Sequence, residues 1–183
     1  MAPTFWELFT ADYRALYRDR GDSPRKSRLA FLPRLVTNPS LHAVLLYRLA
    51  NASPRYLGWF WRQVLVSKHG MDWTGHIEIG PGLRLPHPMG ILIGPGVHLG
   101  SEVLISHNVS IGGDAHGRAP RIGDRVAIYP GAIIIGNVTI GEGSIVGAAN
   151  FVTSDVPPNS VVKRGVVEPM RESSFSREVD RTP

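Results

Sequence analysis

Two residues in the middle of the chain are suited to proton transfer. His87, set between Pro86 and Pro88, follows Asp72 by fifteen residues. A histidine has an ordinary pKa near neutrality, so His87 is a candidate general base, and a carboxylate beside it would fix its tautomer and stabilise the imidazolium. Taken alone, His87 can also be a surface histidine beside two prolines, and Asp72 a residue that caps a turn.

The other histidines raise the hypothesis of a metal centre. His76, His87, His107 and His116 are spread over the central region, and the chain has no cysteine. A zinc site shared between subunits needs three converging histidines, and we expect a close pair separated by four residues, which this set lacks. We therefore expect no metal, and we expect His107 to be exposed on a coil face.

The elements that must position these side chains have a six-residue period. After Ile122, aliphatic residues stand six apart, and a small or aliphatic residue follows each by four. This spacing fits neither a 3.6-residue helix nor simple strand alternation. It is typical of a solenoid in which each short strand forms one side of a triangular coil and the first residue of each hexad points inward. These first-position residues are Ile122, Ile128, Ile134, Ile140, Val146 and Val152.

The same period begins earlier in the chain and is interrupted twice. Ile93 follows Leu85 by eight residues, a slip of two beyond the period of six. Ile122 follows Ile111 by eleven residues where six would suffice. We expect the excess, residues 112–121, to leave the solenoid as a loop, which is a common place for a functional site on a rigid scaffold. The first positions are Ile79, Leu85, Ile93, Leu99, Ile105 and Ile111, and the fifth positions are Leu83, Met89, Val97, Val103 and Val109.

The flanking regions differ from the solenoid. Apolar residues at helical spacing predict helices over residues 5–17, 40–50 and 56–68, with Asn38 or Ser40 as the cap of the second. We expect a helical N-terminal region over 1–70, a solenoid domain over 71–165 and a polar C-terminal tail over 166–183. The aromatic run Trp59-Phe60-Trp61 is interpreted as packing or subunit contact rather than membrane contact.

Composition limits the remaining choices. The chain has 183 residues, 43% of them hydrophobic, and a formal charge of +5 with a pI near 10.0. This charge suits an acidic partner, which can be a nucleic acid, a membrane surface or a phosphorylated cofactor, although solvated surface charge is the simpler interpretation. No stretch reaches the roughly 20 apolar residues that span a bilayer, and no signal-peptide pattern opens the chain. We expect a cytoplasmic location and no membrane association.

A longer motif carries a family resemblance. Its residues are, in order, Asp72, Gly80, His87, Gly90 and the pair Gly112-Gly113. This motif resembles the serine O-acetyltransferase group of hexapeptide-repeat acyltransferases, and the resemblance extends from about residue 40 to residue 161. It implies an all-β solenoid, a left-handed parallel β-helix preceded by a short α-helical region. It also implies an enzyme of amino-acid biosynthesis that transfers acetyl from acetyl-CoA to the hydroxyl of serine or a serine-like small acceptor.

The resemblance implies roles at the reacting atoms. His87 is the expected general base for the acceptor hydroxyl and Asp72 its partner, and His87 then returns the proton to the departing CoA thiolate. Backbone N–H groups near Gly112 and Gly113 would stabilise the tetrahedral oxyanion.

The resemblance also implies a place for acetyl-CoA. Gly113 and Ala148 match positions that line the pantetheine arm, whereas Pro130 at a further matching position has no N–H to donate. Lys163 and Arg164 are candidates for binding the CoA phosphates, or they are ordinary surface charges.

Two departures from the family pattern concern the acceptor. Pro86 stands where the family has an aspartate, and Arg118-Ala119-Pro120 stands where it has Arg-His-Pro. Arg118 and His116 are therefore the candidate substrate-binding residues of the loop. His116 stands five residues after Ile111, as does the catalytic histidine of galactoside and maltose acetyltransferases, so it is also a rival base. The alternatives are an O-acetyltransferase of a sugar or polysaccharide hydroxyl, and a non-catalytic or metal-binding hexapeptide protein.

The assembly implied by the resemblance is a homotrimer with its sites between neighbouring subunits. Only about 70 residues precede the solenoid, so we expect a trimer rather than a dimer of trimers. The chain ends Asp180-Arg-Thr-Pro183 and not in isoleucine, so we expect no complex with cysteine synthase. We expect no nucleic-acid partner.

Overall fold

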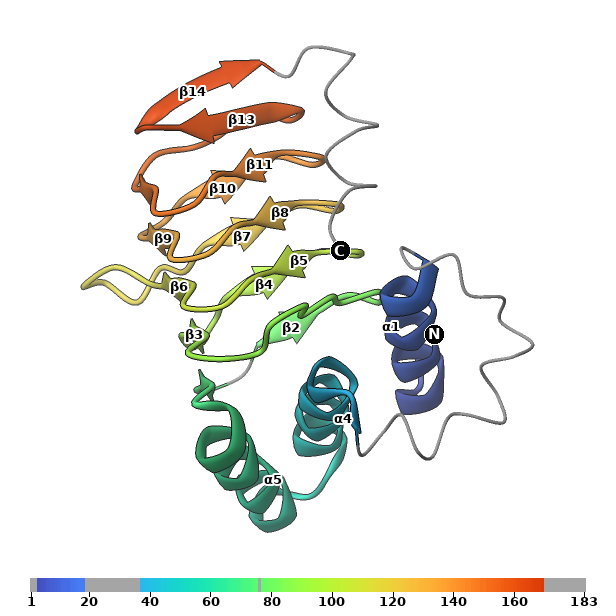
Figure 1. The fold of residues 1–183 in the computed structure, drawn as a ribbon. Helices are drawn as coiled ribbons and strands as arrows, with labels where there is room; N and C mark the ends of the chain where they lie inside the picture. The colour runs from blue at the N-terminus through green and yellow to red at the C-terminus, as the bar shows by residue number, and fades with distance from the viewer. Residues whose placement is uncertain (1–2, 19–36, 76, 170–183) are drawn as a thin grey trace.

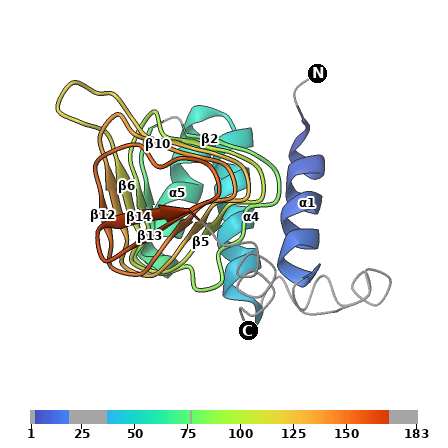
Figure 2. The same cartoon turned by 90° about the horizontal axis from the view of Figure 1, so that it is seen from above.

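The protein is a stack of short β-strand coils with helices at one end. The computed structural model describes residues 3–18, 37–75 and 77–169. Figure 1 shows the coils rising one above another, with two helices beneath the first coil and a third helix beside it. Seen along the stack in Figure 2, the coils superimpose, and the loop after β6 projects beyond their outline.

The described helices are α1 (Phe5–Arg18), α4 (Pro39–Ala52) and α5 (Arg55–His69). The Asn38 side chain accepts hydrogen bonds from the N–H groups of Ser40 and Leu41, so the predicted cap of the second helix is confirmed as Asn38. Gly70 ends α5 in a left-handed conformation, φ 59° and ψ 27°, which glycine adopts without strain. The chain turns there into the first coil.

The strands form three sheets that make up the sides of the solenoid, and all pairs are parallel except β13–β14. Sheet A has the order β1-β3-β6-β9-β12, sheet B β10-β7-β4-β2, and sheet C β14-β13-β11-β8-β5. The predicted fold, a parallel β-solenoid of hexapeptide repeats with a helical N-terminal region, is confirmed. The strands are β1 (Asp72–Trp73), β2 (Glu78–Ile79), β3 (Leu92–Ile93), β4 (His98–Leu99), β5 (Leu104–Ile105), β6 (Ser110–Gly112), β7 (Arg121–Ile122), β8 (Ala127–Ile128), β9 (Ile133–Ile135), β10 (Thr139–Ile140), β11 (Ile145–Val146), β12 (Phe151–Val152), β13 (Ser160–Lys163) and β14 (Val166–Pro169).

The core of the solenoid is built from the hexad positions. None of the first-position residues from Leu85 to Val152 is more than 4% exposed. Burying each such side chain contributes roughly 1.5–3 kcal/mol. One fifth-position assignment is wrong, because Met89 is 61% exposed and Ile91 is fully buried in its place. The two-residue slip moves the inward position from Met89 to Ile91, which places Met89 in the surface turn after His87.

The solenoid ends in a β-hairpin. β13 pairs in parallel with β11, and β14 then folds back on β13 in an antiparallel hairpin. Arg164 and Gly165 form its two-residue turn with φ values of 51° and 76°, as in a type I′ turn. Residues 166–169 of the expected tail are therefore a strand, and residues 170–183 lie outside the described residues.

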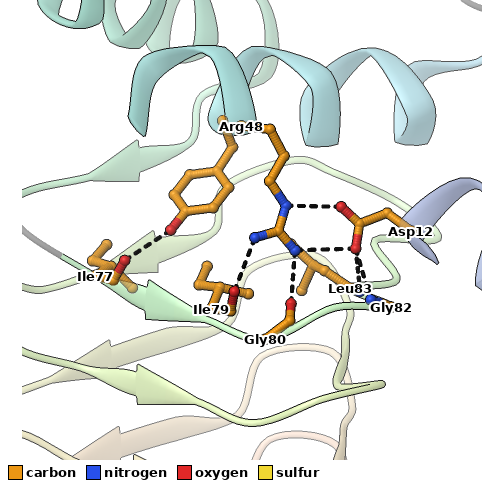
Figure 3. Close-up of polar contacts among 8 residues, drawn as sticks. Asp12, Arg48, Ile77, Ile79, Gly80, Gly82 and Leu83 are labelled. Atoms are coloured by element: carbon orange, nitrogen blue, oxygen red, sulfur yellow. Dashed lines mark hydrogen bonds and ion pairs between the residues drawn. The ribbon is translucent and has the colours of Figure 1, made fainter. Parts of the chain in front are cut away.

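A buried ion pair joins the helices to the first coil. Asp12 of α1 and Arg48 of α4 are 2% and 4% exposed, and Arg48 Nε lies 2.8 Å from Asp12 Oδ2. Asp12 Oδ1 also accepts hydrogen bonds from the N–H groups of Gly82 and Leu83, both at 2.8 Å. Arg48 donates to the carbonyls of residues 79–80 (Figure 3). Each charge is thus paired and hydrogen-bonded, which is the condition for burying it.

The helical region contains no membrane span within its described residues. None of the helices in residues 3–18, 37–75 and 77–169 is both long and apolar enough to cross a bilayer.

Candidate active site

His87 lies at the corner where the chain passes from sheet C to sheet A. Its side chain is exposed, and the helical region holds the turn around it. Ser40 Oγ at the start of α4 donates to the Pro86 carbonyl at 3.1 Å, and the Gly90 N–H donates to the His69 carbonyl at 3.2 Å. The candidate base is therefore open to solvent on a turn that α4 and α5 support.

A second histidine lies next to the candidate base. The ring centroids of His87 and His107 are 5.9 Å apart at an interplanar angle of 75°. His107 is half-buried, and its Nδ1 is buried without a hydrogen-bond partner among the described residues, so the expectation that it is simply exposed is wrong. The two imidazole rings lie edge to face.

Asp72 lies on the first strand of sheet A. It is exposed, and it aligns with Leu92, five residues after His87. No hydrogen bond joins Asp72 to His87 in the part of the chain that the structure describes. Sheet A and its adjoining corner bring Asp72 and His87 to one end of the stack. A hydrogen bond between the two side chains stays a prediction.

The corner between sheets C and A forms a continuous column of turns. The His107 carbonyl accepts from Gly131 N–H at 3.1 Å, and the Pro130 carbonyl accepts from Ala149 N–H at 2.9 Å. Successive coils are about 4.8 Å apart, so the three coils from His107 to the β13–β14 turn span roughly 15 Å. The column therefore runs from the candidate base toward the candidate CoA-binding residues.

Asn150 links those CoA-binding candidates to one another. Its buried side chain donates to the carbonyls of Gly147 and Ala148 at 2.9 and 3.1 Å, and its Oδ1 accepts from the Gly165 N–H at 2.9 Å. Ala148 is thereby held beside the hairpin that carries Lys163 and Arg164, both of which are exposed. The hexad pattern gives no sign of this role for Asn150, because its bonds to residues 147–148 and to Gly165 arise only from the folded turns.

The loop after β6 is folded around Asp114. Its carboxylate accepts from the backbone N–H of His116 at 2.9 Å and of Arg118 at 3.0 Å, and it forms an ion pair with the Arg118 guanidinium at 2.7 Å. The backbone hydrogen bond from Arg118 is the main cause that lowers the pKa of Asp114 below its usual range. The His116 side chain is exposed on this loop, with no contact to His87 among the described residues.

Gly113 starts the loop in a tight space. A Cβ at this position would lie 2.9 Å from the Arg118 carbonyl oxygen, so only glycine fits without displacing the backbone. Gly113 follows the strands of sheet A, whereas the turn of His87 precedes them. The two therefore lie at opposite edges of sheet A within one chain.

The structure also bears on the hypothesis of a metal centre built from histidines. Across residues 3–18, 37–75 and 77–169, no group of three or more His, Cys, Asp or Glu side chains is arranged to hold a metal ion. His76 lies outside the described residues.

Comparison with known proteins agrees with this architecture. Residues 119–153 match the family described as bacterial transferase hexapeptide (six repeats). The serine acetyltransferase of Helicobacter pylori is 34% identical over 133 residues, which cover 69% of this chain and 78% of that protein.

Two solved structures extend the similarity to the helical region. A serine acetyltransferase of Neisseria gonorrhoeae in complex with serine superposes with a TM-score of 0.75 and 29% identity, covering 90% of this chain and 68% of that one. Soybean serine acetyltransferase complexed with serine gives a TM-score of 0.74 and 30% identity, covering 91% and 70%.

The solenoid and its hexads are those of the bacterial hexapeptide transferases. Within that class, the extent of the match to the Helicobacter protein shows that this chain belongs to the serine acetyltransferase family. The predicted family and enzyme class are thus confirmed.

Proposed function

We propose that this chain transfers the acetyl group of acetyl-CoA to the hydroxyl of serine. The observation that carries the proposal is the match over most of the chain to serine acetyltransferases, two of which have been solved with serine bound. These comparisons favour serine over a sugar hydroxyl and over a non-catalytic or metal-binding protein.

The proposed reaction uses His87 as general base. A serine hydroxyl is a poor nucleophile at neutral pH, so His87 removes its proton as the oxygen attacks the thioester carbonyl. Backbone N–H groups near Gly112 and Gly113 stabilise the oxyanion of the tetrahedral intermediate. The intermediate expels the CoA thiolate, which takes the proton from His87. The products are O-acetylserine and CoA.

Asp72 is proposed to orient the imidazole of His87. A carboxylate within reach of one ring nitrogen leaves the other free to accept the hydroxyl proton, and it stabilises the imidazolium. Asp72 is exposed at the same end of the stack as His87, which is the support for this role.

Acetyl-CoA is proposed to lie along the corner column. Its thioester end lies near His87, and its phosphates lie near Lys163 and Arg164 at the β13–β14 turn. Ala148 presents a small side chain between these ends, and Asn150 holds that stretch of backbone in place. Lys163 and Arg164 are exposed cations that can bind phosphate oxygens.

A homotrimer is proposed to complete the site. His87 and Gly113 lie at opposite edges of sheet A in one chain, so a site that uses both draws on two copies. The loop of a neighbouring copy would then bring Arg118 and His116 toward the serine. Within one chain Arg118 is paired with Asp114 through Nε and Nη2, which leaves Nη1 to donate to the carboxylate of serine. The expected cytoplasmic location is part of the same proposal.

A thiol-release assay with purified protein tests the proposal. Acetyl-CoA is supplied with serine, homoserine and a set of sugars, and we expect release of CoA with serine. His87→Ala should reduce kcat by roughly 10²–10⁴-fold, the usual contribution of a general base. His98→Ala is the matched control, because His98 is a histidine on sheet B paired with Glu78 at 3.1 Å.

His116→Ala separates the two candidate bases. We expect this variant to raise the KM for serine more than it lowers kcat. A near-normal rate in His87→Ala together with a lost rate in His116→Ala would transfer the role of base to His116.

A further inference from the structure

Two histidines outside the proposed reaction form a pair beneath the His87 turn. His42 lies in the first turns of α4 and His69 is the last residue of α5. His42 Nδ1 and His69 Nε2 are 2.9 Å apart, and their ring centroids are 5.2 Å apart. The pair therefore ties the beginning of one helix to the end of the next.

Both helices of this pair reach the turn that carries His87. The His69 carbonyl accepts from the Gly90 N–H at 3.2 Å. Ser40, two residues before His42, donates to the Pro86 carbonyl at 3.1 Å. The turn is thus held on both sides of His87 by groups adjoining the pair.

The pair can form only one hydrogen bond between its facing ring nitrogens. Such a bond needs an N–H on one nitrogen and a lone pair on the other, so the two facing nitrogens hold a single proton between them. Burial lowers the pKa of both histidines below the ordinary value, which favours the neutral rings that this bond suits.

We propose that the His42–His69 pair positions the turn that carries His87, and that it sets the rate of acetyl transfer without touching either substrate. This inference rests on the proposed role of His87 as general base. His42 and His69 are positioning residues, because their contacts reach His87 through the backbone of residues 86–90. A base displaced by about 1 Å loses rate by up to roughly 100-fold.

Four variants of the full chain test the inference. His42→Leu and His69→Leu remove the pair, His42→Asn keeps a donor near the position of Nδ1, and Gln63→Ala is an exposed control on α5. We expect both leucine variants to lower kcat by roughly 10- to 100-fold with little change in the KM for acetyl-CoA, whose proposed site runs up the column. His42→Asn should recover most of the lost rate, and Gln63→Ala should match the wild type.

The outcomes separate positioning from simple stability. Wild-type kcat in both leucine variants, or a loss in His42→Asn as large as in His42→Leu, would overturn the inference. If a leucine variant does not fold, His42→Phe provides the second test, since it keeps a ring but removes the bond to His69, and it should also lower kcat. A wild-type protein that releases no CoA with any acceptor would instead overturn the proposed function.

Discussion

Removing the carboxylate of Asp12 should destabilise the protein strongly. In Asp12→Ala, the Arg48 guanidinium stays buried, while its two bonds to Asp12 are lost and the N–H groups of Gly82 and Leu83 lose their acceptor. Breaking a buried pair in this way costs about 3–5 kcal/mol. A domain of this size loses about 2–4 °C in Tm per kcal/mol, so we expect Tm to fall by roughly 6–20 °C.

Urea denaturation followed by circular dichroism at fixed protein concentration measures this loss. Arg14→Ala, an exposed charge on the same helix, is the control and should change the free energy of unfolding by less than about 0.5 kcal/mol. The double variant Asp12→Leu/Arg48→Met should be more stable than Asp12→Ala, because no unpaired charge remains. An Asp12→Ala variant that loses less than about 1 kcal/mol would show that α1 does not depend on this ion pair for docking.

Three further predictions concern the site and its support. Asn150→Ala should raise the KM for acetyl-CoA several-fold and leave the KM for serine unchanged, because it removes the side-chain oxygen that accepts from Gly165 N–H in the β13–β14 turn. Equal changes in both constants would contradict the proposed placement of CoA. Burial lowers the pKa of His42 and of His69 below the ordinary 6.5, so the unfolded chain binds more protons and stability falls as pH drops below about 6.5. In the double variant His42→Asn/His69→Gln, the urea concentration at the unfolding midpoint should change less between about pH 7.5 and pH 5.5 than in the wild type. The same pH dependence in both proteins would refute this cause. Asp114→Ala should speed tryptic cleavage after Arg118, and unchanged proteolysis would show that Asp114 does not hold the loop.

The fold was predictable because the solenoid repeats one local rule. Each hexad places an aliphatic residue inward at the same point of the coil, so the spacing alone predicts the three sheets and the position of the loop at 112–121. The hexad pattern does not predict two local features of the structure. The slip after Leu85 moved the buried position from Met89 to Ile91, and the β13–β14 hairpin depends on φ values at Arg164 and Gly165 that carry no hexad signal.

The site was predictable only in part, since its contacts join distant residues. His87 is proposed from its residue type and the family motif, but its neighbour His107 lies a full coil away along the chain. The pairs Asp12–Arg48 and His42–His69 depend on how the three described helices pack against one another and the first coil, which helical periodicity does not specify. A paired histidine at the end of one helix and the start of another gives no pattern in a single sequence.

Identification of the acetylated product tests the central claim most directly. Purified protein is incubated with acetyl-CoA and serine, released CoA is counted by its thiol, and the product is identified by mass spectrometry. We expect one O-acetylserine for each CoA released, with the rate lost in His87→Ala and retained in His98→Ala. CoA release without O-acetylserine, or no release with serine while another hydroxylated acceptor is consumed, would contradict the assignment of serine as the substrate.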